Sequence, residues 1–403
     1  MKKALTGNEA MAEAMRQIGP DVVAAYPITP ATEVVQIFAG FVADGLVETE
    51  FIPVESEHSA MSACIGASAA GARAMTGTAS QGLALMWEML YIASGLRLPI
   101  VLAEVNRALS APINIHCDHS DTMGARDSGW IQIYSENAQE AYDNMIQAIR
   151  IAEACRIPVM VTADGFIISH GMEVVEILED DEVSRFVGER KPAYSLLDID
   201  HPKTVGAIDF TDYYFEHKMQ IIQAMKEAGN FIIEVAKDYE KEFKRSYSFF
   251  EEYKLDDAQV AIVALGSVCG TTKVVVDELR KEGIKAGLLK LRVFRPFPGH
   301  LLARAISGCS AIAVLDRADG LSGVGGPLFA EVKSALYDCI HRGTPITADE
   351  AKMIPTPPII KNYVYGLGGR DMRKEHLREV FSDLQEAVKG ERGELVRYIG
   401  VRE

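Results

Sequence analysis

Hydrophobic residues in the first 164 positions of the chain recur at two spacings, one helical and one extended. Residues 8–18 place apolar side chains at positions 10, 11, 14, 15 and 18, and Gly19-Pro20 follows, so this segment is predicted to be a helix that ends there. The same alternation predicts helices over 32–41, 58–70, 83–94 and 138–155, and strands over 22–26, 50–54, 74–78, 99–105 and 158–164. Strands that alternate with helices favour a parallel sheet with helices on both faces.

A charged and aromatic segment, residues 237–257, interrupts this alternation. Its sequence predicts a linker helix with a docking stripe of four aromatic side chains, Phe243, Tyr247, Phe250 and Tyr253. A second α/β pattern follows, with strands predicted over 259–265, 286–293, 311–315 and 358–364 and helices over 272–282, 299–306, 329–340 and 375–389. We therefore divide the chain into a first domain (1–236), a linker (237–257) and a second domain (258–403).

The charge balance indicates which kinds of molecule the chain is expected to bind. The chain has 41 Lys and Arg against 57 Asp and Glu, a formal net charge of −16, and its cations form no basic block. Phosphate contacts need clustered cations, so nucleic acid is not expected as a partner, and small molecules or other proteins are favoured.

Two further features bear on location. The most hydrophobic stretch, 83–96, contains Glu88 and falls short of the ~20 apolar residues of a membrane span, and polar residues interrupt the N-terminal segment, so neither a membrane segment nor a secretory signal is predicted. The six cysteines occur singly, without a C-x-x-C pair, which is typical of reduced thiols in a cytoplasmic protein and predicts no metal or cluster site in this chain.

Candidate chemistry gathers just after the predicted strands, because ligands of parallel sheets bind beyond the carboxyl ends of strands. After the first strand, the prolines of Tyr26-Pro27-Ile28-Thr29-Pro30 hold the backbone and present the Thr29 hydroxyl, although a rigid turn at a helix start explains the same residues. After the second strand comes Glu57, for which capping of the next helix is the alternative role. Residues 77–82 (GTASQG) lack the first glycine of a G-x-S-x-G elbow and read as a small-residue turn that lets backbone approach a ligand.

The fourth strand is followed by Arg107 and a long segment, 108–130, which contains His116, Asp118, His119 and Asp121. A loop of this length in a compact domain is usually functional. Its His and Asp content could bind a metal, but no H-x-x-x-H spacing is present, so hydrogen-bonded scaffolding is favoured. A guanidinium one residue beyond a buried strand needs a planar acid, from a substrate or a side chain.

Taken in order, these junctions resemble the 2-oxoacid:ferredoxin oxidoreductases, and in particular the alpha subunits of the multi-subunit pyruvate:ferredoxin oxidoreductases. The matching stretches span nearly the whole chain and are AAYPITPATE (24–33), ESEHSAM (55–61), GTASQGLALM (77–86), NRALSAPINIHCDHSDTMGARDSGWIQ (106–132), TADGFIISH (162–170), LRVFRPFP (291–298) and YGLGGRD (365–371). The resemblance implies a parallel-sheet thiamine pyrimidine-binding domain followed by a transketolase C-terminal-like α/β domain.

The resemblance also implies roles for individual residues. The glutamate at Glu57 is expected to hydrogen-bond N1′ of the thiamine aminopyrimidine and to promote removal of the C2 proton. Thr29 and Arg107 resemble the family's contacts to the substrate carboxylate and carbonyl, and threonine rather than a second arginine at position 29 favours pyruvate over oxalate. The remaining cofactor contacts are expected from Pro27, Ile28, Ser80 and Gln81.

Some of the expected machinery is missing from the sequence. Thiamine enzymes hold the diphosphate and Mg²⁺ with a GDG motif, which does not occur here, and single cysteines cannot provide the ligands of a [4Fe-4S] cluster. The resemblance therefore implies a beta subunit that carries the diphosphate and Mg²⁺ motif, and iron-sulfur clusters on partner subunits, together with gamma and ferredoxin-like subunits.

The implied activity is the oxidative decarboxylation of pyruvate with coenzyme A to acetyl-CoA and CO₂, with reduction of ferredoxin. Three alternatives stay open: a different 2-oxo acid, branched-chain or 2-oxoglutarate, because partner residues set much of the pocket; a thiamine enzyme half without electron transfer; and a scaffold that has lost its chemistry. The joint presence of Thr29, Glu57 and Arg107 argues against the scaffold, which has no reason to keep a buried acid and a buried base at strand ends.

Overall fold

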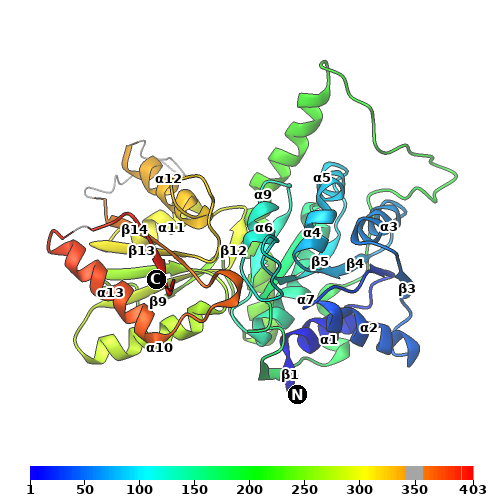
Figure 1. The fold of residues 1–403 in the computed structure, drawn as a ribbon. Coiled ribbons are helices and arrows are strands. Elements are labelled where there is room, and N and C mark those ends of the chain that lie inside the picture. The colour runs from blue at the N-terminus through cyan, green and yellow to red at the C-terminus, as the bar shows by residue number, and fades with distance from the viewer. Residues whose placement is uncertain (342–356, 392, 403) are drawn as a thin grey trace.

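The computed structural model describes residues 1–341, 357–391 and 393–402. Its first half is built on a seven-stranded sheet with the strand order β12-β6-β7-β5-β4-β2-β3 (Figure 1). The strands from the first half are parallel and comprise β2 (Val22–Ala25), β3 (Glu50–Pro53), β4 (Ala74–Thr78), β5 (Val101–Asn106), β6 (Ile131–Tyr134) and β7 (Val159–Asp164). A parallel sheet of this kind confirms the predicted fold class.

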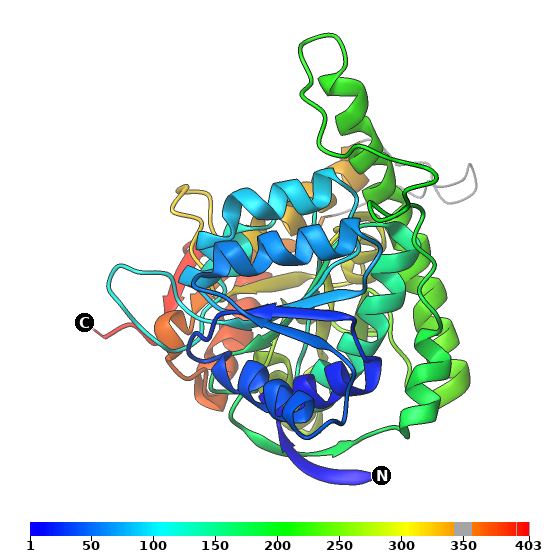
Figure 2. The same ribbon diagram turned by 90° about the vertical axis from the view of Figure 1, so that its right-hand side faces the viewer.

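Helices cover both faces of this sheet, as Figure 2 shows for the blue helices above and below the blue strands. One face carries α1 (Gly7–Ile18), α2 (Thr32–Ala43), α7 (Ala138–Cys155) and α9 (Tyr214–Phe243), which share one apolar core with the sheet. The other face carries α3 (Glu57–Ala69), α4 (Gln81–Leu85) and α5 (Trp87–Gly95), which pack into a second core. Burial on both faces explains why the strands read as continuous apolar runs.

Local signals explain the bounds of the helices, as α1 illustrates. The Thr6 hydroxyl accepts the Glu9 N–H, and the Glu9 carboxylate accepts the Thr6 N–H at 2.7 Å, which forms a capping box. The apolar positions predicted for this helix are all buried. Gly19 then takes a left-handed conformation (φ +58°) that ends the helix.

The second half is built on a six-stranded sheet with the order β15-β14-β13-β10-β11-β9. Its strands are β9 (Phe250–Tyr253), which is antiparallel at one edge, and the parallel β10 (Val260–Ala264), β11 (Ala286–Leu291), β13 (Ala311–Asp316), β14 (Ile359–Tyr365) and β15 (Val396–Ile399). Helices α10 (Val268–Lys281) and α13 (Lys374–Val388) cover one face, and α11 (Gly299–Ile306) and α12 (Pro327–His341) cover the other.

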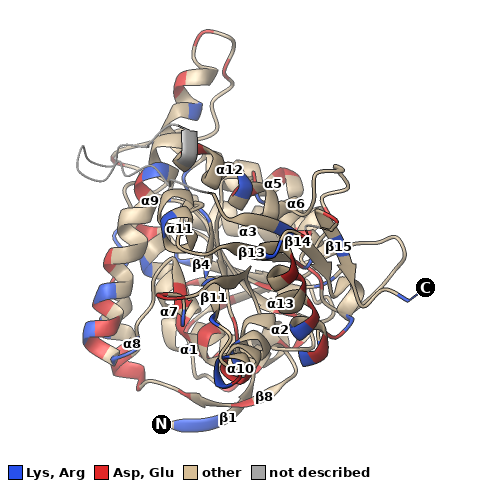
Figure 3. Ribbon diagram, turned by 90° about the vertical axis from the view of Figure 1, so that its left-hand side faces the viewer, with Lys and Arg blue, Asp and Glu red and all other residues tan. Residues whose placement is uncertain are grey.

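Acidic and basic residues are mixed on the outer helices of both halves. Figure 3 shows acidic and basic residues interspersed on α9, α10 and α13. Ion pairs join α10 to α13, where Arg378 bonds both Glu278 and Glu282 at 2.9 Å. These exposed pairs contribute little to stability, because water screens them.

One strand crosses between the two halves. After β11 the chain passes directly into β12 (Val293–Arg295), which pairs antiparallel with β6 and completes the edge of the seven-stranded sheet. Val293 is fully buried in the core of the first sheet. The strand predicted over 286–293 is therefore two strands in different sheets, and the division of the chain at 237–257 stays a prediction.

The prediction of a linker helix over 237–257 is wrong. Helix α9 begins much earlier, at Tyr214, and ends where Lys244 adopts a left-handed conformation (φ +62°), while residues 250–253 form the edge strand β9. The helix extends toward its N-terminus because apolar side chains such as Ile232 and Val235 pack on α7. The aromatic residues of the predicted stripe do pack inward, but from three different local structures.

Other elements carry weaker signals and were not predicted. The predicted helix 83–94 is two helices that meet at Met86. The elements absent from the sequence-based prediction are β1 (Lys2–Thr6), which pairs with β8 (Met172–Glu176), and β6, α6 (Ser120–Gly124), α8 (Asp180–Val187), β15 and a short 3-10 helix (Leu367–Gly369). Strand β6 begins directly after the long segment 108–130, at residues to which the sequence assigns no element.

An arm projects from the body at the top of Figure 1, formed by residues 189–213 and the first turns of α9. Several large apolar side chains on it are exposed, among them Leu197, Ile199, Ile208, Phe210, Tyr213 and Phe215. In the described residues, no helix is both long and apolar enough to cross a membrane.

Candidate functional site

The parallel strands β2, β3 and β5 bring three candidate residues to one edge of the seven-stranded sheet, at the carboxyl ends of the strands. Thr29 follows β2, Glu57 begins α3 after β3, and Arg107 directly follows β5. The carboxyl ends of parallel strands share an edge, so these residues, far apart in sequence, lie on the same side of the sheet.

Glu57 is buried in the first turn of α3. The N-cap of this helix is Ser56, whose hydroxyl accepts the Ser59 N–H at 3.2 Å, so the capping role considered for Glu57 belongs to Ser56. In the described part of the chain, the Glu57 carboxyl has no hydrogen-bond or ion-pair partner. A buried carboxyl with unused oxygens is suited to a ligand that carries a ring nitrogen.

The turn after β4 packs tightly against Glu57. An ideal Cβ at Gly82 would lie 2.8 Å from Glu57 Oε1 and 2.2 Å from Thr78 Oγ1, so only glycine lets the start of α4 approach the carboxyl this closely. Thr78 Oγ1 is itself buried and has no hydrogen-bond partner among the described residues. The Glu57 carboxyl beside this glycine suits a ring nitrogen of a ligand, whereas Thr78 Oγ1 is enclosed by the protein.

Ser80 has a strained backbone, with φ +49° and ψ −116°. Strain of this kind in a residue with a side chain is typical of functional sites. Its hydroxyl lies 2.8 Å from the Ala108 carbonyl and 2.7 Å from Gln81 Oε1, and its N–H is held by Asp121 at 3.2 Å. The Ser80 side chain is thus engaged within the protein, and a role at the cofactor would come from the shape of the turn.

Arg107 follows β5, the strand that pairs with β4, and is 7% exposed. Its Nη1 donates to the Thr29 carbonyl at 3.0 Å and its Nε donates to the Asn114 carbonyl at 2.8 Å. No carboxylate in the described residues forms an ion pair with this guanidinium, and Asp121 binds only its backbone N–H, at 2.8 Å. The structure thus joins Arg107 to Thr29 and leaves a buried positive charge that suits a small carboxylate ligand.

The long loop after Arg107 is held from the second half of the chain. Asn114 Nδ2 donates to the Gly368 carbonyl at 2.9 Å, and the Gly368 N–H is held by Asp118 at 3.2 Å. The His119 N–H donates to the Arg317 carbonyl at 2.9 Å. The YGLGGRD stretch therefore supports the loop that carries Arg107, a contact that sequence reasoning did not identify.

Cys117, His119 and Asp164 form a cluster of metal-ligand types, with ligand atoms within 4.8 Å of one another. His119 Nε2 lies 2.7 Å from Asp164 Oδ1, and Arg317 Nη1 lies 2.9 Å from Asp164 Oδ2. Burial alone would raise the pKa of Asp164, but His119 and Arg317 outweigh it and hold the pKa below its ordinary value. A guanidinium already paired with the carboxylate opposes a metal cation, so this cluster reads as a contact between the two halves.

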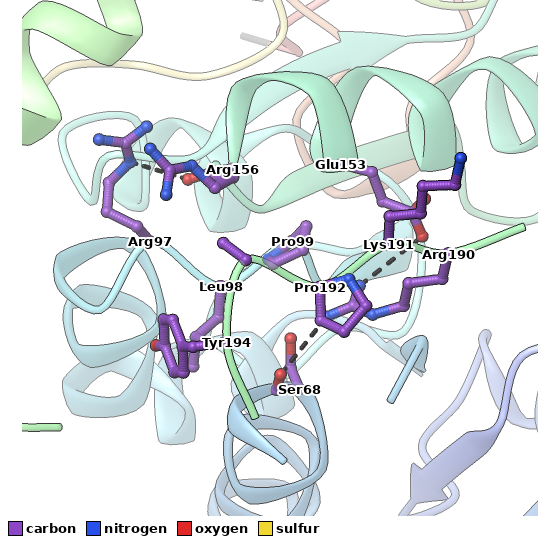
Figure 4. A pocket seen from close by; sticks show the side chains of 11 residues that line it. Ser68, Arg97, Leu98, Pro99, Glu153, Arg156, Arg190, Lys191, Pro192 and Tyr194 are labelled. Carbon is purple, nitrogen blue, oxygen red and sulfur yellow. Dashed lines mark hydrogen bonds and ion pairs between the residues drawn. The ribbon is translucent and has the colours of Figure 1, made fainter. Parts of the chain in front are cut away.

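A cavity near the amino-terminal ends of the strands, away from Glu57 and Arg107, is lined by several arginines (Figure 4). Arg97 donates to the carbonyls of Cys155 (2.8 Å) and Arg156 (2.9 Å) at the end of α7. Arg190 donates to the Gly71 carbonyl at 2.6 Å, and lies 3.6 Å from the Glu153 carboxylate. These cations bind the carbonyl ends of helices, where the macrodipole favours positive charge, so they act structurally rather than as an anion site.

Two family models match the chain. The first, described as pyruvate flavodoxin/ferredoxin oxidoreductase, thiamine diP-binding, matches residues 13–237. The second, described as pyruvate:ferredoxin oxidoreductase core domain II, matches residues 258–377. The gap between the two matches falls at the charged and aromatic segment.

Curated relatives are similar over nearly the full length. Pyruvate synthase subunit PorA of Thermotoga maritima is 56% identical, with 99% of this chain and 98% of the relative covered. The subunit of the same name from Methanocaldococcus jannaschii is 47% identical over 96% of this chain and 95% of the relative. Ketoisovalerate oxidoreductase subunit VorA of Pyrococcus abyssi is 42% identical, with 99% and 97% covered.

Solved structures share the fold. A 2-oxoglutarate:ferredoxin oxidoreductase from Magnetococcus marinus superposes with a TM-score of 0.69 at 19% identity, covering 96% of this chain but only 65% of that one. A split-gene transketolase superposes with a TM-score of 0.54 at 14% identity, covering 96% of this chain and 98% of that one. At these identities the likeness concerns the fold alone.

Proposed function

Because the chain belongs to the pyruvate flavodoxin/ferredoxin oxidoreductase family, we propose that it is the alpha-type subunit of a pyruvate:ferredoxin oxidoreductase. The proposed reaction converts pyruvate, coenzyme A and oxidised ferredoxin into acetyl-CoA, CO₂ and reduced ferredoxin. The two relatives of highest identity given above, at 56% and 47%, are both named pyruvate synthase subunits, which supports pyruvate as the substrate.

One observation carries the proposal. At a single sheet edge, a buried carboxyl (Glu57) lies beside a glycine turn, and a buried guanidinium (Arg107) contacts the Thr29 backbone; within the described residues the first has no partner and the second no acidic partner. The first group suits a ring nitrogen and the second suits a small carboxylate. A thiamine enzyme that acts on a 2-oxo acid needs both.

Thiamine diphosphate, when bound, supplies the carbon nucleophile that attacks the 2-oxo group. In the proposal, Glu57 holds a proton against N1′ of the pyrimidine, while Gly82 allows close contact with the ring. Because α3 is capped by Ser56 instead, the Glu57 carboxyl is free for this task. The Pro27-Ile28 and Ser80-Gln81 turns would shape the sides of the ring site.

Arg107 would bind the substrate carboxylate. Its Nε and Nη1 already contact carbonyls, which orients the guanidinium and leaves Nη2 for the ligand. The exposed Thr29 side chain lies beside it and would contribute one hydroxyl. These two groups select for a small acid with an adjacent carbonyl.

The proposal needs partners. The sequence has no GDG motif for a diphosphate and Mg²⁺, and its cysteines cannot ligate a cluster, so a beta subunit and iron-sulfur subunits complete the enzyme. We propose a cytoplasmic hetero-oligomer in which ferredoxin docks elsewhere. The alternative substrate is a branched-chain 2-oxo acid, favoured by the 42% identity to a ketoisovalerate oxidoreductase subunit.

The test is anaerobic purification of the chain with the subunits encoded beside it. Thiamine, iron and sulfide would be assayed in the complex, and ferredoxin reduction would be measured with pyruvate, 2-oxobutyrate, 2-oxoisovalerate and 2-oxoglutarate. We expect thiamine and iron in the complex, the highest kcat/KM with pyruvate, and neither activity nor tight thiamine diphosphate binding in the isolated chain. A complex without ferredoxin reduction on any of these acids would overturn the proposal.

A further inference from the structure

A glutamate lies inside the seven-stranded sheet, on strand β5. Glu104 has an exposed fraction of 0%, and in the part of the chain that the structure describes neither of its carboxyl oxygens has a hydrogen-bond donor. Its neighbours in register are Thr78 on β4 and Thr162 on β7, which carry no charge. An isolated buried carboxylate is strongly unfavourable, so this group requires either a proton or a cation.

The neighbouring acid, Asp121, accepts four hydrogen bonds. Its Oδ2 accepts the backbone N–H groups of Arg107 (2.8 Å) and Ser80 (3.2 Å). Its Oδ1 accepts the side-chain amide of Asn106 (2.9 Å) and the backbone N–H of Thr122 (2.7 Å). Burial raises the pKa of Asp121, but these N–H donors oppose that shift, whereas Glu104 accepts no comparable set of hydrogen bonds, so Asp121 is the better placed of the two acids to carry the negative charge.

No ion pair to a cation neutralises the two acids in the described residues. The Arg107 guanidinium is directed to the carbonyls of Thr29 and Asn114 instead. The other acid that faces Asp121 is Asp118, which is engaged by Ser120 and by the Gly368 N–H. Burial raises the pKa of Glu104 well above its ordinary value, and the charge of Asp121 raises it further.

We propose that Glu104 stays protonated at neutral pH and donates a hydrogen bond to Asp121, so that the two carboxyls together hold the turns that carry Ser80 and Arg107. Glu104 touches neither substrate nor cofactor and is a positioning residue that acts through Asp121. Its value to catalysis rests on the proposed function. The shared proton and the hydrogen bonds that Asp121 accepts from the Ser80 and Arg107 backbone N–H groups do not depend on that function.

Two variants separate the proton from mere packing. Glu104→Gln keeps the shape and an N–H donor toward Asp121, whereas Glu104→Met keeps the approximate volume and has no donor. Infrared difference spectra of the full chain against Glu104→Gln at pH 7 should contain the C=O stretch of a protonated carboxylic acid, present only in the unmodified chain. Absence of this band would overturn the proposal.

Hydrogen exchange measures the hold on the two turns without any need for activity. In Glu104→Met, amide exchange should accelerate by about tenfold or more in peptides covering residues 79–83 and 105–109, and by less than about threefold in Glu104→Gln. A peptide covering β10 (Val260–Ala264) serves as the internal control. Equal acceleration in both variants, or none in either, would contradict the positioning role.

Kinetics of the assembled complex test whether the Glu104–Asp121 pair affects binding of the 2-oxo acid. Glu104→Met should raise KM for the 2-oxo acid by about tenfold with a smaller change in kcat, and Glu104→Gln should restore KM to within about threefold. If the complex reduces no ferredoxin at all, the proposed function fails while the infrared and exchange results still decide the proton. If the complex is active and KM is unchanged in Glu104→Met, the positioning role fails alone.

Discussion

The carboxyl ends of the strands differ between the two large sheets in how their polar groups are satisfied. In the six-stranded sheet, Asp316 accepts the N–H groups of Leu328 (2.7 Å) and Phe329 (3.0 Å) at the start of α12, and the side-chain amide of Asn362 at 2.8 Å. In the seven-stranded sheet, the side-chain oxygens of Thr78 and Glu104 accept no hydrogen bond from any residue that the structure describes. Among the described residues, the buried side-chain polar atoms without hydrogen-bond partners all belong to residues 8–190.

This difference separates scaffold from site. A buried polar group left without a partner costs about 1–3 kcal/mol, so a fold that only needs stability satisfies it. In the six-stranded sheet, Asp316 is satisfied by residues of the same half. Arg317, which follows β13, likewise forms an ion pair with Asp164 of the first half. We call the edge that carries Glu57 the open edge, because within the described residues the Glu57 carboxyl has no partner and the Arg107 guanidinium has no acidic partner, as is expected of a surface that a ligand completes.

The largest expected effect concerns the open edge. Glu57→Gln should slow hydrogen–deuterium exchange at C2 of thiamine in the assembled complex by about 10²–10⁴-fold, because the amide cannot share a proton with the ring nitrogen. The free energy of unfolding should change by less than about 1 kcal/mol, since Ser56 caps the helix. The exposed neighbour Glu55, changed to Gln, is the matched control. Normal exchange in Glu57→Gln would remove Glu57 from the chemistry.

The ion pair between Asp164 and Arg317, which joins the two halves, is expected to affect mainly the stability of the protein. Asp164→Ala leaves Arg317 buried at 3% side-chain exposure without its counter-charge and should lower the free energy of unfolding by about 3–5 kcal/mol. Denaturant unfolding of the complex measures this, with exposed Asp198→Ala as the control. A loss below about 1 kcal/mol would show that this contact is not a stabilising part of the scaffold.

Arg107 tests the open edge through the substrate. Arg107→Ala should lower kcat/KM for pyruvate by about one to three decades, at ~1.4 kcal/mol per decade, while stability falls less. Arg107→Lys should recover little, because an ammonium cannot make the planar two-point contact. Arg185, exposed and paired with Glu242, supplies the control variant Arg185→Ala. Unchanged kcat/KM in Arg107→Ala would exclude the carboxylate-binding role.

The pH dependence of stability offers a quantitative test of Glu104. Its pKa is raised in the folded state by burial and by Asp121, from an ordinary value of 4.5. The folded state thus keeps a proton that the unfolded state releases, and the stabilising contribution is full below pH 4.5 and is lost as pH rises toward the folded pKa. Relative to the unmodified chain, Glu104→Gln should gain up to about 1.4 kcal/mol of stability per pH unit above pH 5.

Denaturant unfolding between pH 5 and pH 8 measures this gain. Exposed Glu252→Gln is the control and should run parallel to the unmodified chain. A constant difference between Glu104→Gln and the unmodified chain over this range would mean that Glu104 is ionised in the folded state.

The smallest expected effect is at Thr29. Thr29→Val is nearly isosteric and removes one hydroxyl, while the backbone carbonyl that holds Arg107 stays in place. KM for pyruvate should rise within about tenfold, with kcat nearly unchanged. Steady-state kinetics of the complex decide this, and a loss as large as that of Arg107→Ala would shift the main carboxylate contact to Thr29.

Much of the fold could be predicted because it rests on local patterns. The predicted helix 138–155 and strand 74–78 match α7 and β4 residue for residue, since strong apolar periodicity and nearby caps mark them. Strands β1 and β8 pair only with each other, and their short, half-exposed sequences carry little periodicity. The bounds of helix α9 could not be predicted correctly, because its apolar face is explained by packing against α7, a distant segment of the chain.

Local patterns were enough to predict the strand–helix alternation, the positions of Thr29, Glu57 and Arg107 after strands, and the lack of a diphosphate motif, because each depends on residues close together along the chain. The folded arrangement was needed to show that β12 joins the other sheet, that Gly368 supports the loop after Arg107, and that Glu104 and Asp121 interact in the interior. These features depend on contacts between distant segments, and a glutamate in an apolar strand reveals its charge state only when its neighbours in space are known.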